Sequence, residues 1–200
     1  MSDLTTIRDL AGLGHTSTAV SDSALIIIDA QNTYCEGIMQ LEGVQPAMAE
    51  CKKLLDRFRQ AGRPIFHIRH DAGPGTPYDV SEPIGQIADI VAPIDGESVI
   101  TKNYPNSFVS TDLDEQLKKA GVNNLILAGF MSHMCVNSTA RGAFSLGYMP
   151  TVVASATATR ALPSKVTGND VPAAQVHEAA LAALSDLPSA VVPAVSDVPD

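Results

Sequence analysis

The chain has 200 residues and a formal net charge of −9, with 45% hydrophobic and 18% charged residues. This length predicts a single domain, 1–200, that can bury a substantial core. No local Lys/Arg cluster offsets the acidic charge, which argues against binding to phosphate backbones or anionic lipids. The apolar runs are far too short to cross a bilayer. Neither nucleic acid nor a membrane is therefore an expected partner.

The first 22 residues are expected to precede the domain as an N-terminal extension. They lack the basic start and continuous apolar core of a secretory signal, so the expected location is the cytoplasm. Three cysteines, Cys35, Cys51 and Cys135, are an odd number at wide spacings. They fit neither a disulfide framework nor a CxxC metal pair, and reduced thiols are expected.

Three stretches repeat one pattern: an amphipathic helical segment, a glycine and then an apolar run. They are 51–68 (CKKLLDRFRQAGRPIFHI), 113–130 (LDEQLKKAGVNNLILAGF) and 135–154 (CVNSTARGAFSLGYMPTVVA). Around the first, apolar residues recur at helical steps and Gly62 stands where a helix C-cap would, so Cys51 is expected in the core. Each such unit predicts a helix that leads into a strand.

Five apolar runs are continuous, as expected for strands that are covered on both faces. They span 24–28, 64–68, 124–129, 151–154 and 190–194, and 98–101 is a sixth candidate. Strands that alternate with helices predict an α/β fold, a doubly wound, mostly parallel sheet of five to six strands flanked by helices on both faces. Residues 196–200 are expected to form a frayed tail.

The segment 71–96 does not follow this pattern. It is rich in Gly and Pro and is too long for a simple connection in a compact domain. Loops of this length are usually lids or binding loops. A surface excursion that packs at a subunit contact is an equally good interpretation of the same residues.

Three ionisable residues stand at the ends of predicted strands, where ligands bind in such sheets. Asp29 ends one strand, Lys102 ends another, and Cys135 lies in the first turn of the next helix. If Ser132 caps that helix, the helix N-terminus and the Lys102 ammonium are expected to favour a thiolate, with Asp29 as proton acceptor. The alternative is a buried, inert cysteine, which is the commoner fate of a single Cys.

The histidines offer no better activator for the thiol. His133 is two positions from Cys135, and residues two apart on a helix do not face each other. His67 and His70 lie three apart on a predicted strand and face opposite ways, so they cannot share a metal unless the strand contains a bulge. Cys35 is a rival nucleophile without a predicted helix start. No metal and no cofactor are expected.

Three blocks carry a resemblance to a known family. "LIIIDAQNTYC", "VITKNYPNSF" and "LAGFMSHMCVNSTARGAFSLGY" resemble the signature blocks of the isochorismatase-like cysteine hydrolases. That family includes nicotinamidases, N-carbamoylsarcosine amidohydrolases, biuret and ureido-acid hydrolases, and isochorismatase itself. The resemblance runs from about residue 24 to about residue 194, and the three blocks stand in the right order and spacing.

The resemblance implies an Asp-Lys-Cys catalytic triad of Asp29, Lys102 and Cys135. It also implies an oxyanion hole formed by the backbone N–H groups of Met131 and Cys135, with a non-proline cis peptide between Phe130 and Met131. Such donors would stabilise the charge of a tetrahedral intermediate. Five residues of these blocks or beside the site are further candidates for lining the substrate pocket, although each could equally serve packing or a loop: Gln31, Tyr34, His70, Asn103 and Phe108.

The sequence departs from the family pattern at several points. There is no Trp, and FHIRHDAGPG lacks the histidine spacing of the nicotinamidase metal site, so a metal-dependent nicotinamidase is not expected. Thr33 stands where the family usually has an aspartate, which changes the expected polarity of the pocket. Ser155 and Ala156 replace a frequent Asp-Ala pair in a loop.

The resemblance implies a hydrolase that cleaves an amide or ureido C–N bond of a small molecule through a thioester on Cys135. One alternative is vinyl ether cleavage of the isochorismatase type, in which the thiol is dispensable. Another is a binding protein that has kept the fold and lost catalysis, against which the complete triad argues. A homo-oligomer, a dimer or larger, is expected, and the sequence does not name the substrate.

Overall fold

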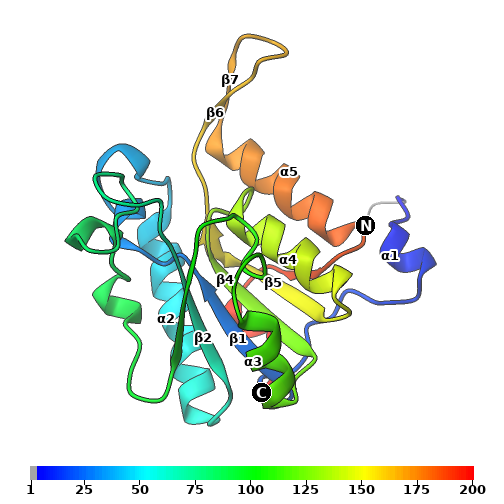
Figure 1. Ribbon diagram of the computed structural model, residues 1–200. Helices are drawn as coiled ribbons and strands as arrows, with labels where there is room; N and C mark the ends of the chain where they lie inside the picture. The colour runs from blue at the N-terminus through cyan, green and yellow to red at the C-terminus, as the bar shows by residue number, and fades with distance from the viewer. Residues whose placement is uncertain (1–3) are drawn as a thin grey trace.

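A computed structural model describes residues 4–200 of the chain. Its centre is a six-stranded sheet in which all neighbouring strands are parallel, in the order β3-β2-β1-β4-β5-β8 (Figure 1). The strands are β1 (Ser23–Ile28), β2 (Ile65–His70), β3 (Ser98–Lys102), β4 (Asn124–Phe130), β5 (Met149–Ala158) and β8 (Ala190–Val192). The predicted α/β fold with a parallel sheet is confirmed, and the sixth candidate strand is present.

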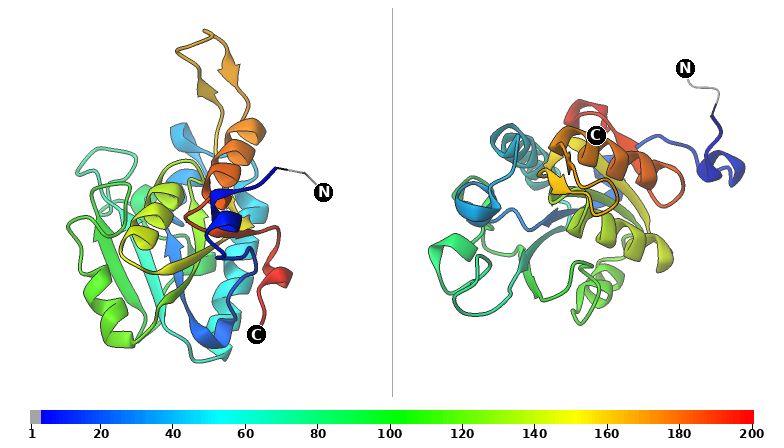
Figure 2. Two further views of the ribbon diagram at one scale, coloured as in Figure 1. Left: turned by 90° about the vertical axis from the view of Figure 1, so that its right-hand side faces the viewer. Right: turned by 90° about the horizontal axis from the view of Figure 1, so that it is seen from above.

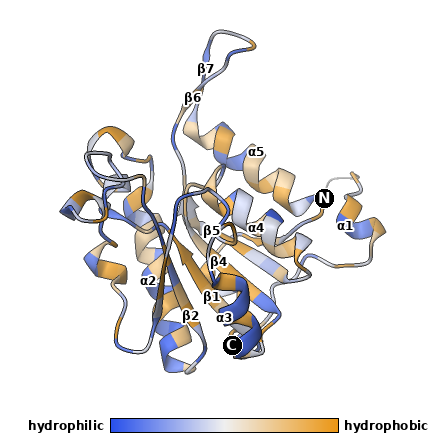
Figure 3. Cartoon of the chain, viewed as in Figure 1, coloured by the Kyte–Doolittle hydropathy of each residue, from blue (hydrophilic) through white to orange (hydrophobic). Residues whose placement is uncertain are grey.

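Helices cover both faces of this sheet. They are α2 (Val44–Gln60), α3 (Leu113–Ala120), α4 (Cys135–Ser145) and α5 (Ala173–Ser185). The short helix α1 (Ile7–Leu10) lies instead beside the end of α5 (Figure 1). The apolar face of α2 forms one core cluster with alternate residues of the central strands, while α3, α4 and α5 pack against the other face. Figure 3 shows the hydrophobic central strands and the hydrophilic outer surfaces of α2 and α3. Cys51 lies in the α2 core, as predicted, with no exposed surface.

The strand order reverses between β1 and β4, which are neighbours in the sheet but are far apart in the sequence. Doubly wound sheets bind their ligands in the crevice outside the carboxyl ends of the strands at such a point. The two strands approach each other closely at Gly129, where a Cβ atom would lie 2.0 Å from the carbonyl oxygen of Ile28. This edge of the sheet is therefore where a site is expected.

The segment 71–96 contains the short 3₁₀ helices Pro83–Gly85 and Asp89–Val91 and folds back along the residues that follow β1. The backbone N–H of Asn32 donates to the Gln86 carbonyl at 2.9 Å, and that of Ala88 donates to the Ala30 carbonyl at 2.9 Å. These bonds make the segment a wall of the carboxyl edge of the sheet. Its position agrees with the binding-loop interpretation, and a subunit contact stays a prediction.

A narrow hairpin between β5 and α5 has no counterpart among the predicted elements. Its strands, β6 (Leu162–Pro163) and β7 (Asp170–Val171), are antiparallel and project away from the body of the molecule (Figures 1 and 2). Val166 near the tip is 96% exposed. Strands of two residues are too short to show an alternating hydrophobic pattern, so the sequence could not indicate them.

Both ends of the described chain pack against the domain. In the N-terminal extension, the Arg8 side chain donates a 2.9 Å hydrogen bond to the Leu187 carbonyl, beyond the end of α5. At the other end, Arg57 donates to the Val198 carbonyl at 2.7 Å, and Val198 is 2% exposed. The expectation of a frayed tail is therefore wrong, because an arginine of α2 holds carbonyl groups that the sequence pattern left without partners.

Among the helices of residues 4–200, none combines the length and the apolar character that a membrane span requires.

Candidate active site

Asp29, Lys102 and Cys135 meet in the interior at the carboxyl edge of the sheet. Lys102 Nζ lies 2.8 Å from Asp29 Oδ2 and 3.4 Å from Cys135 Sγ. Asp29 has no exposed surface, Lys102 is 1% exposed and Cys135 is 6% exposed. A cation, a carboxylate and a thiol are thus enclosed together with little access for solvent.

Each of the three side chains is placed by the end of a different strand. Asp29 directly follows β1, with φ 49° in the left-handed region, which short polar residues tolerate better than most. Lys102 is the last residue of β3, and Cys135 is the first residue of α4, after β4. Because parallel strands end at the same edge, residues more than 70 positions apart are brought into contact.

His70 joins this group as the final residue of β2. It is paired in register with Lys102 on β3, and Lys102 Nζ lies 3.3 Å from its Nδ1. Burial, and next the charge of Lys102, lower the pKa of His70 below its ordinary value, so the imidazole is neutral at pH 7 and Nδ1 can accept a hydrogen bond from the lysine. The three N–H bonds of the lysine ammonium therefore have three acceptors.

The thiol is less acidic than its place at a helix start suggests. Burial, and next the negative charge of Asp29, raise the pKa of Cys135 to about 12, although Lys102 acts in the opposite direction. Burial also raises the pKa of Asp29, against the attraction of Lys102. Burial therefore works against the thiolate that the helix start and Lys102 were expected to favour, and the charge of the resting Cys135 stays a prediction.

The turn before α4 differs from the predicted cap. The residue preceding the helix is Met134, and no side chain caps the helix. Ser132 is fully buried and does not serve as a cap, so that expectation is wrong. The cis peptide between Phe130 and Met131 is present as expected. Within residues 4–200, we find no acceptor for the backbone N–H of Met131 or of Cys135.

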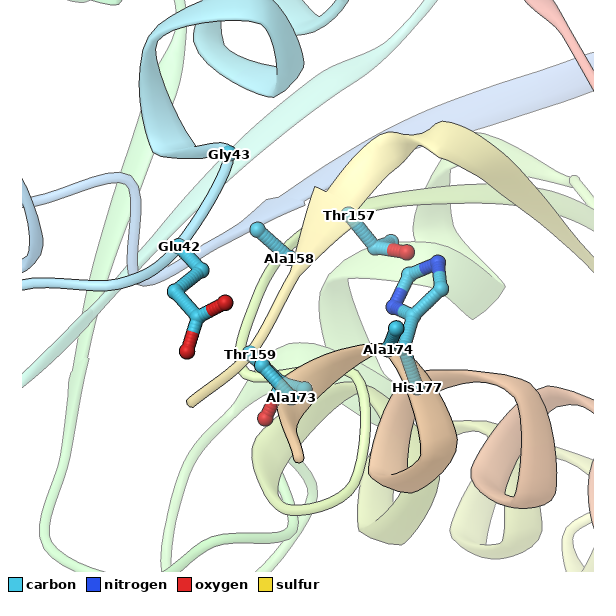
Figure 4. Close-up of a pocket in the computed structure, with 8 residues that line it drawn as sticks. All are labelled: Glu42, Gly43, Thr157, Ala158, Thr159, Ala173, Ala174 and His177. Atoms are coloured by element: carbon cyan, nitrogen blue, oxygen red, sulfur yellow. The ribbon is translucent and has the colours of Figure 1, made fainter. Parts of the chain in front are cut away.

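The turn is instead held from the side by β5 and α5. The Ser132 backbone N–H donates to the Ala158 carbonyl at 2.9 Å, and its Oγ lies 3.0 Å from His177 Nδ1. His177 lines a cavity of about 300 Å³, and Figure 4 shows its ring on the side of the cavity opposite Glu42. No local pattern connects His177 with the turn, since the two are separated in the sequence by α4, β5 and the hairpin.

Two of the five residues that were expected to line the substrate pocket form hydrogen bonds with the backbone of neighbouring segments. The Gln31 amide donates to the carbonyls of His70 and Gly85 and accepts from the His70 N–H, so it ties β2 and the 71–96 segment to β1. Asn103 is exposed and donates to the Asp71 carbonyl at 2.8 Å. These hydrogen bonds support the interpretation that Gln31 and Asn103 hold loops in place.

The aromatic candidates divide between the site and the core. Phe108 stacks on Tyr148 at 5.8 Å between ring centroids and serves packing. Tyr34 packs edge-on against Phe130 and against Tyr78, with ring centroids 5.8 and 5.9 Å away. Burial, and next the charge of Asp29, raise its pKa well above the ordinary value. Tyr34 therefore forms part of the wall beside the triad.

Sequence reasoning missed Tyr78, which the 71–96 segment brings to the site. Its ring lies edge-on to His70 at 5.2 Å. Burial raises its pKa, a hydrogen bond from Tyr34 opposes this, and the charges of Cys135 and Asp29 raise it further. A tyrosine within a Gly- and Pro-rich stretch carries no positional signal, because only the path of the loop decides where it lies.

In the part of the chain that the structure describes, no three His, Cys, Asp or Glu side chains are grouped so that they could hold a metal ion. His67 lies on the other side of β2 from His70, 2.8 Å from Glu97. The arrangement at the triad can supply a nucleophile, a proton acceptor and a fixed positive charge. The absence of a bound metal or cofactor stays a prediction.

Comparison with known proteins identifies relatives of this chain. The model of the isochorismatase domain matches residues 23–193. The chain is 34% identical to a secreted isochorismatase effector of Verticillium dahliae, over 92% of this chain and 94% of the relative. It is 28% identical to a ureidoacrylate amidohydrolase of Stutzerimonas stutzeri, over 68% of this chain and 70% of the relative.

A crystal structure of an isochorismatase from Pseudomonas putida KT2440 superposes with a TM-score of 0.92 at 41% identity. It covers 96% of this chain, and this chain covers 98% of it. The family model spans the sheet and every residue of the triad. The chain belongs to the isochorismatase family of hydrolases.

Proposed function

We propose that the protein hydrolyses an amide or ureido C–N bond of a small molecule through a thioester on Cys135. The observation that carries this proposal is the position of Lys102 Nζ, 2.8 Å from the Asp29 carboxylate and 3.4 Å from the Cys135 sulfur. A thiol, a base and a cation in one buried group are what nucleophilic catalysis by a protonated cysteine needs. The similarity to an amidohydrolase of ureidoacrylate supports a C–N bond as the target.

In the first half of the reaction, Cys135 Sγ attacks the carbonyl carbon while its proton passes to Asp29. The raised pKa of the Asp29 carboxyl makes it a stronger base than an exposed aspartate. Lys102 stabilises the negative charge on sulfur as it forms. The backbone N–H groups of Met131 and Cys135, which have no acceptor within residues 4–200, would donate to the oxyanion.

The tetrahedral intermediate then collapses as the C–N bond breaks, and the leaving nitrogen takes the proton from Asp29. A water molecule gives a proton to Asp29 and attacks the thioester, which restores the thiol and releases the acid. The same carboxyl thus serves as base and acid in each half, and the proton count balances without a further reagent.

The experiment is to measure ammonia release from a panel of small amides and ureido acids, with nicotinamide included. Cys135→Ser should lower turnover by at least about 1,000-fold, since it removes the nucleophile. Cys35→Ala is the matched control, because Cys35 is a half-buried free thiol that has no role in the proposed reaction, and it should keep activity within about threefold. Ammonia release by Cys135→Ser at the wild-type rate would contradict the proposal.

The same experiment distinguishes this proposal from two alternatives, which are vinyl ether cleavage and a binding protein without catalytic activity. Cleavage of isochorismate by both the wild type and Cys135→Ala would favour vinyl ether cleavage. Binding of a panel compound by the wild type without any turnover would favour a binding protein. The cytoplasmic location and a homo-oligomer stay predictions.

A further inference from the structure

Ser132 stands where the sequence predicts a helix cap, yet its hydroxyl is bound elsewhere. It lies three residues before Cys135, the first residue of α4. A capping serine accepts a hydrogen bond from the backbone N–H two or three residues further along the chain. In this protein no side chain caps α4, and the Ser132 Oγ lies 3.0 Å from His177 Nδ1. The serine therefore forgoes the local bond and makes one to a distant helix.

The bond that Ser132 does not make involves a donor that the proposed reaction uses. The N–H groups two and three residues after Ser132 belong to Met134 and Cys135. The Met134 N–H already donates to the Met131 carbonyl at 3.0 Å, which leaves the Cys135 N–H as the donor for a capping hydroxyl. That N–H is also one of the two proposed donors to the oxyanion. A serine hydroxyl bound to it would have to be displaced before the oxyanion could accept its hydrogen.

The backbone of the turn is held without the serine side chain. The Ser132 N–H donates to the Ala158 carbonyl at 2.9 Å, and the ring of His133, the next residue, hydrogen-bonds the Thr159 hydroxyl. Both contacts tie the turn to β5 and its end. The bond between Ser132 and His177 therefore decides chiefly where the serine hydroxyl points.

The hydroxyl has a strong reason to find a new partner if His177 is removed. Ser132 has no exposed surface, so bulk solvent does not replace the imidazole. A buried hydroxyl without a hydrogen bond is costly. The acceptor capacity of the hydroxyl and the unused Cys135 N–H three residues away fit each other. Loss of the histidine is thus expected to turn the serine into the cap that the sequence suggests.

We propose that His177 is a positioning residue, which holds the Ser132 hydroxyl and so keeps the Cys135 N–H free for the oxyanion. This inference rests on the proposed C–N hydrolysis. It adds a residue of α5 that acts through Ser132 and touches neither the substrate nor the reacting atoms.

The test removes the histidine, the hydroxyl and then both. In His177→Leu the free hydroxyl should bind the Cys135 N–H, so kcat for an accepted substrate should fall by about 10- to 100-fold, approaching the loss of one oxyanion donor. KM should stay within about threefold, because the oxyanion forms only after binding. Ser132→Ala removes the competing hydroxyl and should keep kcat within about threefold of the wild type. Ser132→Ala/His177→Leu should recover kcat to within about threefold of Ser132→Ala.

Two further variants of His177 separate positioning from packing. His177→Gln keeps a hydrogen-bonding group near Ser132 and should retain most of kcat. His177→Met fills space without such a group and should behave as His177→Leu does. Urea unfolding measures the packing loss of each variant, which Ser132→Ala should not restore. An equal loss of kcat in Ser132→Ala and His177→Leu, or a double variant no faster than His177→Leu, would overturn the proposal, because the bond would then act by fixing the turn.

A crystal structure of His177→Leu or His177→Met gives a measurement that does not depend on turnover. The Ser132 Oγ should lie within about 3.2 Å of the Cys135 backbone nitrogen, as a hydrogen bond requires. If the wild type hydrolyses no compound of the panel while the hydroxyl has moved in this way, the proposed reaction fails and the control of the Cys135 N–H by His177 stands. A hydroxyl that stays away from this nitrogen in both variants overturns the positioning role.

Discussion

Lys102 Nζ and Asp29 Oδ2 form an ion pair 2.8 Å long in which neither side chain has exposed surface. Burying two charges is expensive, and their attraction compensates only when the geometry is good and further donors and acceptors are satisfied. Here the lysine also reaches Cys135 and His70, while Asp29 Oδ1 has no hydrogen-bond partner in the described residues. The pair leaves one carboxylate oxygen available, which is what a proton acceptor requires.

The first prediction concerns the stability of this pair. Lys102→Met should reduce the free energy of unfolding at pH 7 by about 3–5 kcal/mol, because it leaves the Asp29 carboxylate buried without its cation. Asp29→Asn/Lys102→Met should be less destabilised than Lys102→Met, because the double variant carries no charge at this place. Urea unfolding of the wild type, both single variants and the double variant would measure the coupling. Additive losses would show that the two side chains do not act as a pair.

The second prediction concerns the reactivity of the three thiols. Burial raises the pKa of Cys135 to about 12 and that of Cys51 to about 12. Cys135 is only 6% exposed, and Cys51 has no exposed surface. Cys35 is half-buried and is therefore expected to react first with iodoacetamide at pH 7.5, ahead of Cys135 and then Cys51. Peptide mass spectrometry after timed labelling gives the order. Faster labelling of Cys135 would mean that the free enzyme holds a thiolate beside Lys102.

The third prediction concerns the contact between β1 and β4. In Gly129→Ala the new methyl group would lie 2.0 Å from the Ile28 carbonyl oxygen, and φ at this position is 114°. The strands must separate, so we expect a loss of at least about 3 kcal/mol in the free energy of unfolding. Gly168→Ala is the control: φ there is 76° and nothing lies within 4 Å, so only backbone strain of about 1–2 kcal/mol is expected. Similar losses in both variants would contradict the close approach.

The fourth prediction concerns His177, whose imidazole lies 3.0 Å from the Ser132 hydroxyl. Burial lowers its pKa below the ordinary 6.5, with Glu178 opposing. The unfolded chain then binds a proton near pH 6.5 that the folded chain binds only at lower pH, so the contribution of His177 is complete above 6.5 and is lost as pH falls through the folded pKa.

His177→Gln removes this titration and keeps a polar side chain near Ser132. The stability advantage of the wild type over the variant should therefore shrink between pH 7.5 and pH 5.5, as measured by urea unfolding at several pH values. A difference that stays constant or grows on acidification would show that the histidine titrates as it does in the unfolded chain.

Much of the fold could be predicted from the sequence because its signals are local. Continuous apolar runs such as 24–28 and helical spacing around Cys51 depend only on neighbouring residues, and each marked an element that the structure contains. Asp29, Lys102 and Cys135 could be selected because the first two stand at strand ends, the third begins the helix after a strand, and parallel strands end at one edge. Their meeting follows from the strand order, while their catalytic roles stay a proposal.

What the tertiary structure decided is how these groups are surrounded. The acidity of Cys135 depends on how much water the folded chain excludes, and burial reversed the shift that a helix start and a lysine alone would produce. The contact of His177 with Ser132 and the position of Tyr78, which the 71–96 segment brings to His70, join residues that no local pattern connects. Sequence alone determined which chemical groups reach the edge of the sheet, because strand periodicity is local. Only the packing of distant segments set their solvation and their partners, since electrostatic energies depend on distance and burial in three dimensions.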